Sequence, residues 1–235
     1  MTEHSSRQYQ LDLEAIRSRV LQMGGLVEKQ FHDAMNCFRS LNVAEAERII
    51  AADSEVNQLE VSLDDACTHL IVKRQPAAND LRTVMATIKV ITDLERIGDE
   101  ASKIARAARS IQQRGQPPIA HEEIVRVMGA LASKQLHGAL DAFARLDAPQ
   151  ATRLILGDEE INHEYRSVMR TAVTFMMEDP RTISCALETV WVAKAIERIG
   201  DHAKNISEYV VYIVEGKDIR HTDYALSQQG NDQSS

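Results

Sequence analysis

The chain has 235 residues, a formal net charge of −8 and only 4% aromatic residues. This length allows one or two domains with a sizeable core. The acidic balance argues against nucleic acid or anionic lipid as a partner, because both require a basic surface. No apolar run approaches the ~20 residues of a membrane span, so another protein would have to bring this chain to a membrane.

The three cysteines indicate a reducing compartment. Cys37, Cys67 and Cys185 lack the spacing of a metal site, and their number is odd. Without a signal peptide, this pattern predicts reduced, buried thiols in a cytoplasmic protein.

Apolar residues three and four positions apart predict three helices in the first half of the chain. The expected helices cover residues 10–41, 44–73 and 80–113, after a polar start that we expect to fray. Gly24-Gly25 predicts a bend in the first helix. Asn79 is expected to cap the third.

The second half repeats this organisation after a Gly- and Pro-rich linker at 114–118. Helices are predicted over 119–146 and 147–177, with Asp147 as a cap, and a last helix runs from beyond Asp179-Pro180 to 214, before Gly216. The predicted domains are a three-helix bundle over 10–113, a second over 119–216, and a polar mobile tail over 217–235.

A five-residue motif, Glu-Arg-Ile-Gly-Asp, occurs at residues 95–99 and again at 197–201. Residues 28–60 also align with 133–165. Repetition on this scale indicates an internal duplication. Because short connections favour antiparallel neighbours, we predict an all-α fold of six long antiparallel helices, in two tandem three-helix bundles related by a pseudo-twofold axis.

The repeated motif places two carboxylates one helical turn apart. Glu95 lies over Asp99 and Glu197 over Asp201, an arrangement of like charges that costs a helix roughly 0.2–0.5 kcal/mol. The intervening glycine costs about 1 kcal/mol more relative to alanine. The neighbouring Arg96 and Arg198, with solvent screening, would offset part of this cost. A hard cation on an outward-facing surface would offset it as well.

The second helix of each copy offers further oxygen donors at the same four-residue spacing. These are Asp53 with Asn57, and Asp158 with Asn162. Antiparallel packing would bring each pair beside the Glu/Asp pair of its own copy and complete a metal-binding shell. As plain surface charges and polar flanking residues, the same side chains would need no ligand.

Two other readings stay open. Glu160 and His163 form a Glu-x-x-His, the signature of a ferritin-like, carboxylate-bridged metal oxidase, but that architecture needs a second copy and the position matching His163 is Gln58. A metal-free helical interaction module is the other alternative. The sequence shows no Gly-rich phosphate loop and no nucleophile–base pair.

These motifs resemble the phosphate-uptake regulator family, PhoU. The resemblance covers about residues 8–216 and rests on both Glu-Arg-Ile-Gly-Asp motifs and on three further stretches: Arg74-Gln75-Pro76 with Asp80-Leu81-Arg82, Asp53-Ser54-Glu55-Val56-Asn57, and Asn205-Ile206. It implies two three-helix bundles in pseudo-twofold relation.

The resemblance also implies a function. Members of the family bind iron, zinc, manganese or magnesium through surface Glu/Asp-x-x-x-Asp motifs, which points here to Glu95, Asp99, Glu197 and Asp201, with Asp53 and Asp158 as weaker additions. The family acts in the cytoplasm as a non-enzymatic negative regulator that connects the ATPase of the phosphate ABC transporter with the sensor histidine kinase of the phosphate regulon. A homodimer is expected by the same analogy.

Two departures bear on metal affinity. Ala195 stands where the first copy has Asp93, and Asn57 is neutral where an aspartate would be charged. Both predict weaker metal binding. Ala195 should weaken the site of the second copy.

Overall fold

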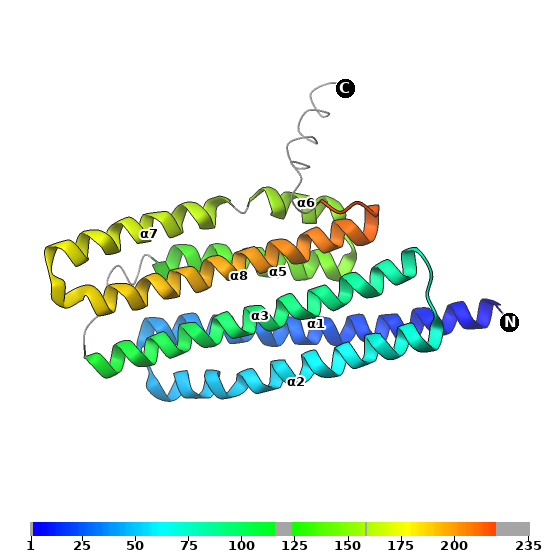
Figure 1. The fold of residues 1–235 in the computed structure, drawn as a ribbon, viewed down its shortest axis with the longest axis horizontal. Helices are drawn as coiled ribbons and strands as arrows, with labels where there is room; N and C mark the ends of the chain where they lie inside the picture. Colours follow the sequence, from blue (N-terminus) through cyan, green and yellow to red (C-terminus); the bar gives the residue numbers. More distant parts are fainter. Residues whose placement is uncertain (1, 116–123, 158, 220–235) are drawn as a thin grey trace, which may run out of the picture.

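The computed structural model describes residues 2–115, 124–157 and 159–219, with side chains for residues 7–115, 126–157 and 159–219. Every regular element in these ranges is helical, which confirms the predicted all-α class (Figure 1). The long elements are α1 Thr2–Ser40, α2 Val43–Arg74, α3 Asn79–Arg114, α5 Gly129–Arg145, α6 Ala148–Leu156, α7 Glu159–Glu178 and α8 Ile183–Glu215. A π-helical turn, Ile124–Met128, precedes α5, and a 3-10 turn, Pro180–Thr182, precedes α8.

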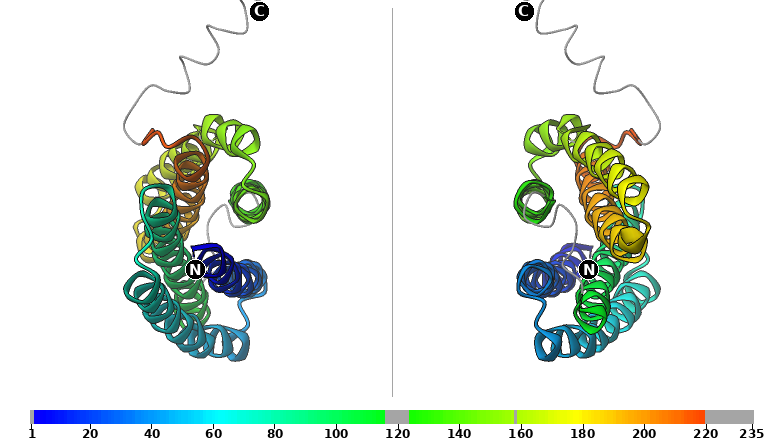
Figure 2. Two further views of the ribbon diagram at one scale, coloured as in Figure 1. Left: turned by 90° about the vertical axis from the view of Figure 1, so that its right-hand side faces the viewer. Right: turned by 90° about the vertical axis from the view of Figure 1, so that its left-hand side faces the viewer.

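The helices α3 and α8 lie side by side at the centre of the molecule and share its most extensive helix–helix contact. The helices α1 and α5 also pack together, while α2 and the α6–α7 pair lie at opposite outer edges (Figure 2). We call α1–α3 the first copy and α5–α8 the second copy.

The apolar stripes read from the sequence form the core. On α3, Leu94, Ile97, Ala101, Ile104, Ala108 and Ile111 are fully buried. On α8, the matching stripe of Ile196, Ile199, Ala203, Ile206 and Val210 is buried in the same way. Burial of these stripes, at roughly 25 cal/mol per Å² of apolar surface, stabilises both central helices.

The predicted bend at Gly24-Gly25 is wrong, because α1 continues through both residues. A Cβ on Gly24 would lie 2.6 Å from Cδ2 of Leu140 on α5. This glycine therefore permits close packing between the two copies instead of breaking the helix. The first helix was expected to begin at residue 10, after a frayed start. In the structure α1 already begins at Thr2.

The predicted cap at Asn79 is wrong as well. Asn79 is the first residue of α3, and Ala78 precedes it at a φ of 48° with no side-chain hydrogen bond at the cap. The carbonyl of Asn79 instead accepts a hydrogen bond from the Thr83 hydroxyl. The turn after Pro76 thus sets the start of α3 through its backbone.

The helix predicted over 147–177 is divided into α6 and α7. Its start is confirmed, because the Asp147 side chain accepts a hydrogen bond from the Gln150 amide at 2.9 Å. The predicted stop at Gly216 is confirmed too, with a φ of 76° that favours glycine. Part of the predicted linker (116–118), the first residues of the fourth predicted helix, Asp158 and residues 220–235 of the tail lie outside the described residues.

All three cysteines are buried, and none of them forms a disulfide within the described residues. Burial, with a smaller contribution from nearby carboxylates, raises the pKa of the Cys37 and Cys67 thiols to about 11. These thiols are thus protonated and unreactive at neutral pH. None of the helices in the described ranges combines the length and apolar character needed to cross a bilayer.

The matched stripes predict matched stability losses. Leu94→Ala and Ile196→Ala remove fully buried side chains at equivalent positions, and each should cost about 2–5 kcal/mol. Urea unfolding followed by circular dichroism should show a lower midpoint for both, whereas Val61→Ala, at a position 62% exposed, should change it little. If only one of the two variants lowered the unfolding midpoint, the cores of the two copies would not contribute equally to stability.

Candidate functional site

The glycine of the repeated motif lies where three helices of its own copy meet. A Cβ on Gly98 would be 3.2 Å from Oε1 of Gln30 on α1 and 3.3 Å from Cγ1 of Val56 on α2. Gly200 faces the equivalent Gln135 and Ile161, with Cδ1 of Ile161 only 2.8 Å away. Packing space therefore accounts for the glycine in both copies, without a ligand.

The first copy brings the predicted carboxylates of α2 and α3 together. Glu95 and Asp99 are half-buried on α3, and Asp53 is buried on α2. The pKa of Glu95 is raised, first by desolvation and then by the charges of Asp99, Glu60 and Asp53, while Arg96 opposes the shift. The carboxylates are therefore close enough to repel one another, and we call Asp53, Glu60, Glu95 and Asp99 the acidic cluster.

Glu60 belongs to this cluster but was not predicted from the sequence. Desolvation, followed by the charges of Asp64 and Asp99, raises its pKa, again against Arg96. Glu60 lies seven residues after Asp53, which is two turns along the same face of α2. A search of the sequence for carboxylates seven residues apart, as well as four residues apart, would have identified Glu60.

A buried amide holds Asp53 in place. Gln30 is 7% exposed, and its Nε2 donates hydrogen bonds to Oδ1 of Asp53 at 3.1 Å and to Oγ of Ser102 at 3.2 Å. Its Oε1 is buried and has no hydrogen-bond partner in the described part of the chain. Such an orphaned acceptor is uncommon in a folded protein. It suits a cation or a water molecule beside Asp53.

The remaining predicted donor of the first copy lies apart. Asn57 is exposed on α2, one turn beyond Asp53. Glu95 in turn is less exposed than predicted, at 15% of its side chain, and it contacts Arg96 at 3.5 Å. The sequence predicted a metal site that faces outward into solvent. The structure instead places these carboxylates on a partly desolvated surface between α2 and α3.

The second copy has a different charge environment. Glu197 forms an ion pair with Lys194, whose ammonium also lies 5.4 Å from the Tyr165 ring centre. Thr92 and Glu60 occupy the positions of Lys194 and Tyr165 in the first copy. A cation of the protein therefore already neutralises Glu197. Asp201 and Asn162 are half-buried, and Asp158 lies outside the described residues.

No three His, Cys, Asp or Glu side chains in the described ranges converge as a ready-made metal site. Glu160 and His163, the residues of the oxidase alternative, are exposed near the start of α7. Binding at the acidic cluster would therefore require its carboxylates to change rotamer.

Asp93 serves the contact between the copies. Its buried carboxylate lies 2.6 Å from Nδ1 of His202 and accepts a hydrogen bond from Asn205 at 3.2 Å, both on α8. We expected Asp93 to add charge to the metal site. Asp93 is instead hydrogen-bonded to α8. The replacement of Asp93 by Ala195 in the second copy therefore changes the α3–α8 interface and not the metal site.

The PhoU domain profile matches residues 20–108 and 125–210. The chain belongs to the PhoU family. It is 45% identical over 221 residues to a phosphate-specific transport system accessory protein PhoU homolog of Pseudomonas aeruginosa, covering 94% of this chain and 91% of that protein. It is 43% identical over 222 residues to phosphate-specific transport system accessory protein PhoU of Escherichia coli, with the same two coverages.

Two solved PhoU structures share the fold. The crystal structure of PhoU from Pseudomonas aeruginosa has a TM-score of 0.86 at 44% identity, and the match covers 89% of this chain and 100% of that one. The phosphate transport system regulatory protein PhoU from Streptococcus pneumoniae has a TM-score of 0.82 at 28% identity, with coverages of 89% and 98%. The PhoU resemblance seen in the sequence is thereby confirmed.

The acidic cluster makes a prediction about pH. Because the fold raises the pKa of Glu95, its contribution to stability is fully present below the unfolded pKa and is lost as pH rises through the folded value. Without divalent metal at neutral pH, Glu95→Gln should therefore raise the melting midpoint by about 1–3 °C, the shift that roughly 0.5–1 kcal/mol produces in a chain of this size. Melting curves with chelator, from neutral to acidic pH, measure this difference, which should vanish in acid.

Glu47→Gln provides the control, since Glu47 is exposed on α2. A loss of stability in Glu95→Gln at neutral pH would show that Arg96 outweighs the surrounding carboxylates.

Proposed function

We propose that this protein is an accessory regulator of phosphate-specific transport. Family membership over nearly the whole chain supports this role, because the relatives are phosphate-specific transport system accessory proteins. The protein would act as a non-enzymatic negative regulator, coupling the ATPase of the phosphate ABC transporter to the sensor histidine kinase of the phosphate regulon. We place it in the cytoplasm, a reducing compartment consistent with three buried cysteines that form no disulfide in the described ranges, and expect a homodimer.

The metal-binding part of the proposal rests on the acidic cluster. A divalent or ferric ion (Fe, Zn, Mn or Mg) would be held by Glu95 and Asp99 of α3 with Asp53 of α2, and Glu60 would join them. Carboxylate oxygens are the donors that hard cations select. The orphaned Oε1 of Gln30, beside Asp53, is consistent with a positive charge nearby.

A bound ion would remove the repulsion that raises the pKa of Glu95. The acidic surface would then become a neutral contact area available to a partner protein. Glu197 and Asp201 would form a second, weaker site, because Lys194 already supplies a positive charge to Glu197. The metal would thus occupy the first copy before the second.

The first test measures bound metal. Protein purified without a metal-affinity column should contain metal by elemental analysis, and the double variant Glu95→Ala/Asp99→Ala should lose most of it while keeping its helicity. Glu197→Ala/Asp201→Ala is the matched variant, and it should lose less. Unchanged metal in the first variant would contradict the site.

The second test addresses regulation. Deleting the gene should raise expression of the phosphate regulon in phosphate-rich medium, because the sensor kinase would no longer be restrained. A reporter fusion measures this, and re-expression of the intact protein should restore repression. Continued repression in the deletion strain would overturn the regulator assignment.

A further inference from the structure

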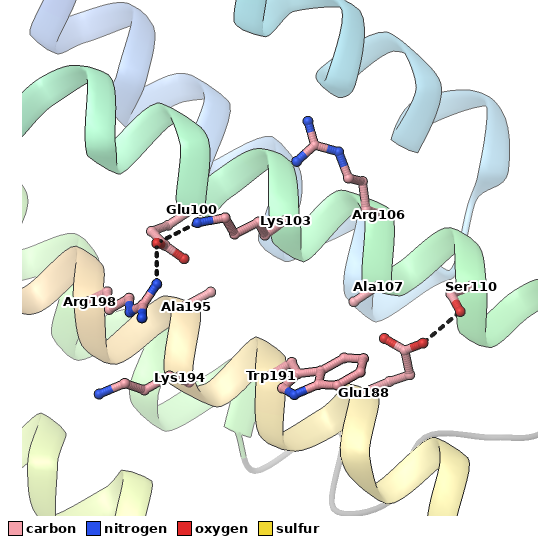
Figure 3. Close-up of a pocket in the computed structure, with 10 residues that line it drawn as sticks. All are labelled: Glu100, Lys103, Arg106, Ala107, Ser110, Glu188, Trp191, Lys194, Ala195 and Arg198. Carbon is pink, nitrogen blue, oxygen red and sulfur yellow. Dashed lines mark hydrogen bonds and ion pairs between the residues drawn. The ribbon is translucent and has the colours of Figure 1, made fainter.

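A cavity of about 480 Å³ opens between α3 and α8 on the side of the molecule that carries Trp191. This volume lies within the roughly 300–1,000 Å³ typical of small-molecule sites. Figure 3 shows the lining residues, which are Glu100, Lys103, Arg106, Ala107, Ser110, Glu188, Trp191, Lys194, Ala195 and Arg198. None of them belongs to the acidic cluster, so the two surfaces are separate.

One end of the cavity is cationic. Lys103 from α3 and Arg198 from α8 both contact Oε1 of the buried Glu100, at 2.8 and 3.1 Å. Two positive charges thus share one negative charge, and about half of each cationic side chain remains exposed. Arg106 extends away from the cavity and adds positive charge at its rim, whereas Lys194, also at the rim, is paired with Glu197 (Figure 3). In a protein of net charge −8, this is a local excess of positive charge.

The middle and the other end of the cavity are different in character. Trp191 is 60% exposed, and its indole extends from α8 toward the far end (Figure 3). At that end lies the buried carboxylate of Glu188. Ser110 and Arg114 both contact its Oε1, at 2.7 and 3.5 Å, so its Oε2 can accept from a further donor. The cavity therefore offers cations, a flat aromatic face and a carboxylate in sequence.

The internal duplication explains why the cavity exists. At the opposite end of the same helix pair, the positions equivalent to Ala107 and Ser110 are Tyr209 and Tyr212. Lys89 lies 5.6 Å from the Tyr209 ring centre, and Lys89 is itself the equivalent of Trp191. Two tyrosine rings and a lysine thus fill the space that two small side chains leave open in the cavity.

A fourth difference between the two ends concerns the interface charge. Ala195 occupies the position of Asp93, whose carboxylate bonds to His202 and Asn205 nearer the other end of the helix pair. The equivalents of His202 and Asn205 are Glu100 and Lys103 in the cavity. The change from Asp93 to Ala195 therefore removes a negative charge from the neighbourhood of Lys103 and leaves its ammonium accessible.

We propose that this cavity binds a nucleotide whose base carries an amino group. The base stacks on Trp191, since aromatic stacking accepts any base. The phosphates contact Lys103 and Arg198 through charge-assisted hydrogen bonds. An amino group of the base donates to Glu188. From Glu188 to Arg198 the helix rises about 15 Å, at ~1.5 Å per residue, which leaves room for base, sugar and phosphates in a row.

The tryptophan gives a direct measurement, because Trp191 is the only one in the chain. The full-length protein is titrated with adenosine diphosphate or guanosine diphosphate while tryptophan emission is recorded, in the presence of a chelator. The chelator removes any contribution from the proposed metal site, so failure here is independent of the proposed function. We expect saturable quenching by both nucleotides and at least tenfold weaker binding of adenosine and of inorganic phosphate.

Two variants locate the binding. Ala107→Tyr introduces the residue found at the equivalent position and should abolish the quenching by filling the cavity. Lys103→Gln leaves the surface structure intact and should raise Kd about tenfold, the loss expected for one charge-assisted hydrogen bond. Lys89→Gln is the matched control, because it removes a lysine at the opposite end of the same helix pair, and it should leave Kd unchanged.

Three results would overturn the proposal. These are no quenching at millimolar nucleotide, quenching that Ala107→Tyr and Lys103→Gln leave unaltered, and binding of inorganic phosphate as tight as that of the nucleotides. The last would show an anion site without base recognition.

Discussion

Each copy depends on a glycine at which three helices meet. The absence of a side chain at Gly98 lets Gln30 of α1 and Val56 of α2 approach α3 together, and Gly200 does the same for Gln135 and Ile161. This close approach fixes the position of α2 along the axis of α3. Asp53 is thereby placed next to Glu95 and Asp99. The carboxylates repel one another because the packing holds them together. The raised pKa of Glu95 is therefore a consequence of how the core packs, because that packing desolvates Glu95 and holds other carboxylates near it.

The duplication preserved this packing and varied the charges around it. In the first copy Glu60 adds a carboxylate to the surface between α2 and α3, whereas in the second copy Tyr165 occupies that position and contacts Lys194. At the α3–α8 interface the difference is one of size, since Tyr209 and Tyr212 at one end correspond to Ala107 and Ser110 at the other. A symmetric frame thus carries two asymmetric surfaces, one acidic and one basic.

The sequence was sufficient for the helices and for bringing Asp53 together with Glu95 and Asp99. The apolar stripes of α3 and α8, with the turns at Asp147 and Gly216, could be placed because period and capping are local properties. The burial of Glu95 and the role of Asp93 could not, since both depend on which neighbouring helix a side chain meets. Gln30 determines the position of Asp53 from α1, 23 residues away, and the repeat pattern says nothing about that contact. The cavity likewise becomes predictable only once α3 and α8 are known to pack antiparallel, because Ala107 and Tyr209 then lie at opposite ends of one interface.

Both proposed sites share α3, which contributes Asp99 to the acidic cluster and Glu100 to the basic cavity. A cation beside Asp99 and a nucleotide phosphate beside Lys103 would attract each other, because Asp99 and Lys103 lie one turn apart on the same face of α3. Thermodynamic linkage requires such an effect to be reciprocal, so each ligand would strengthen the other's binding by the same factor. A regulator built in this way could respond to two chemical signals without a large conformational change, because the coupling is electrostatic and α3 serves both sites as one continuous helix.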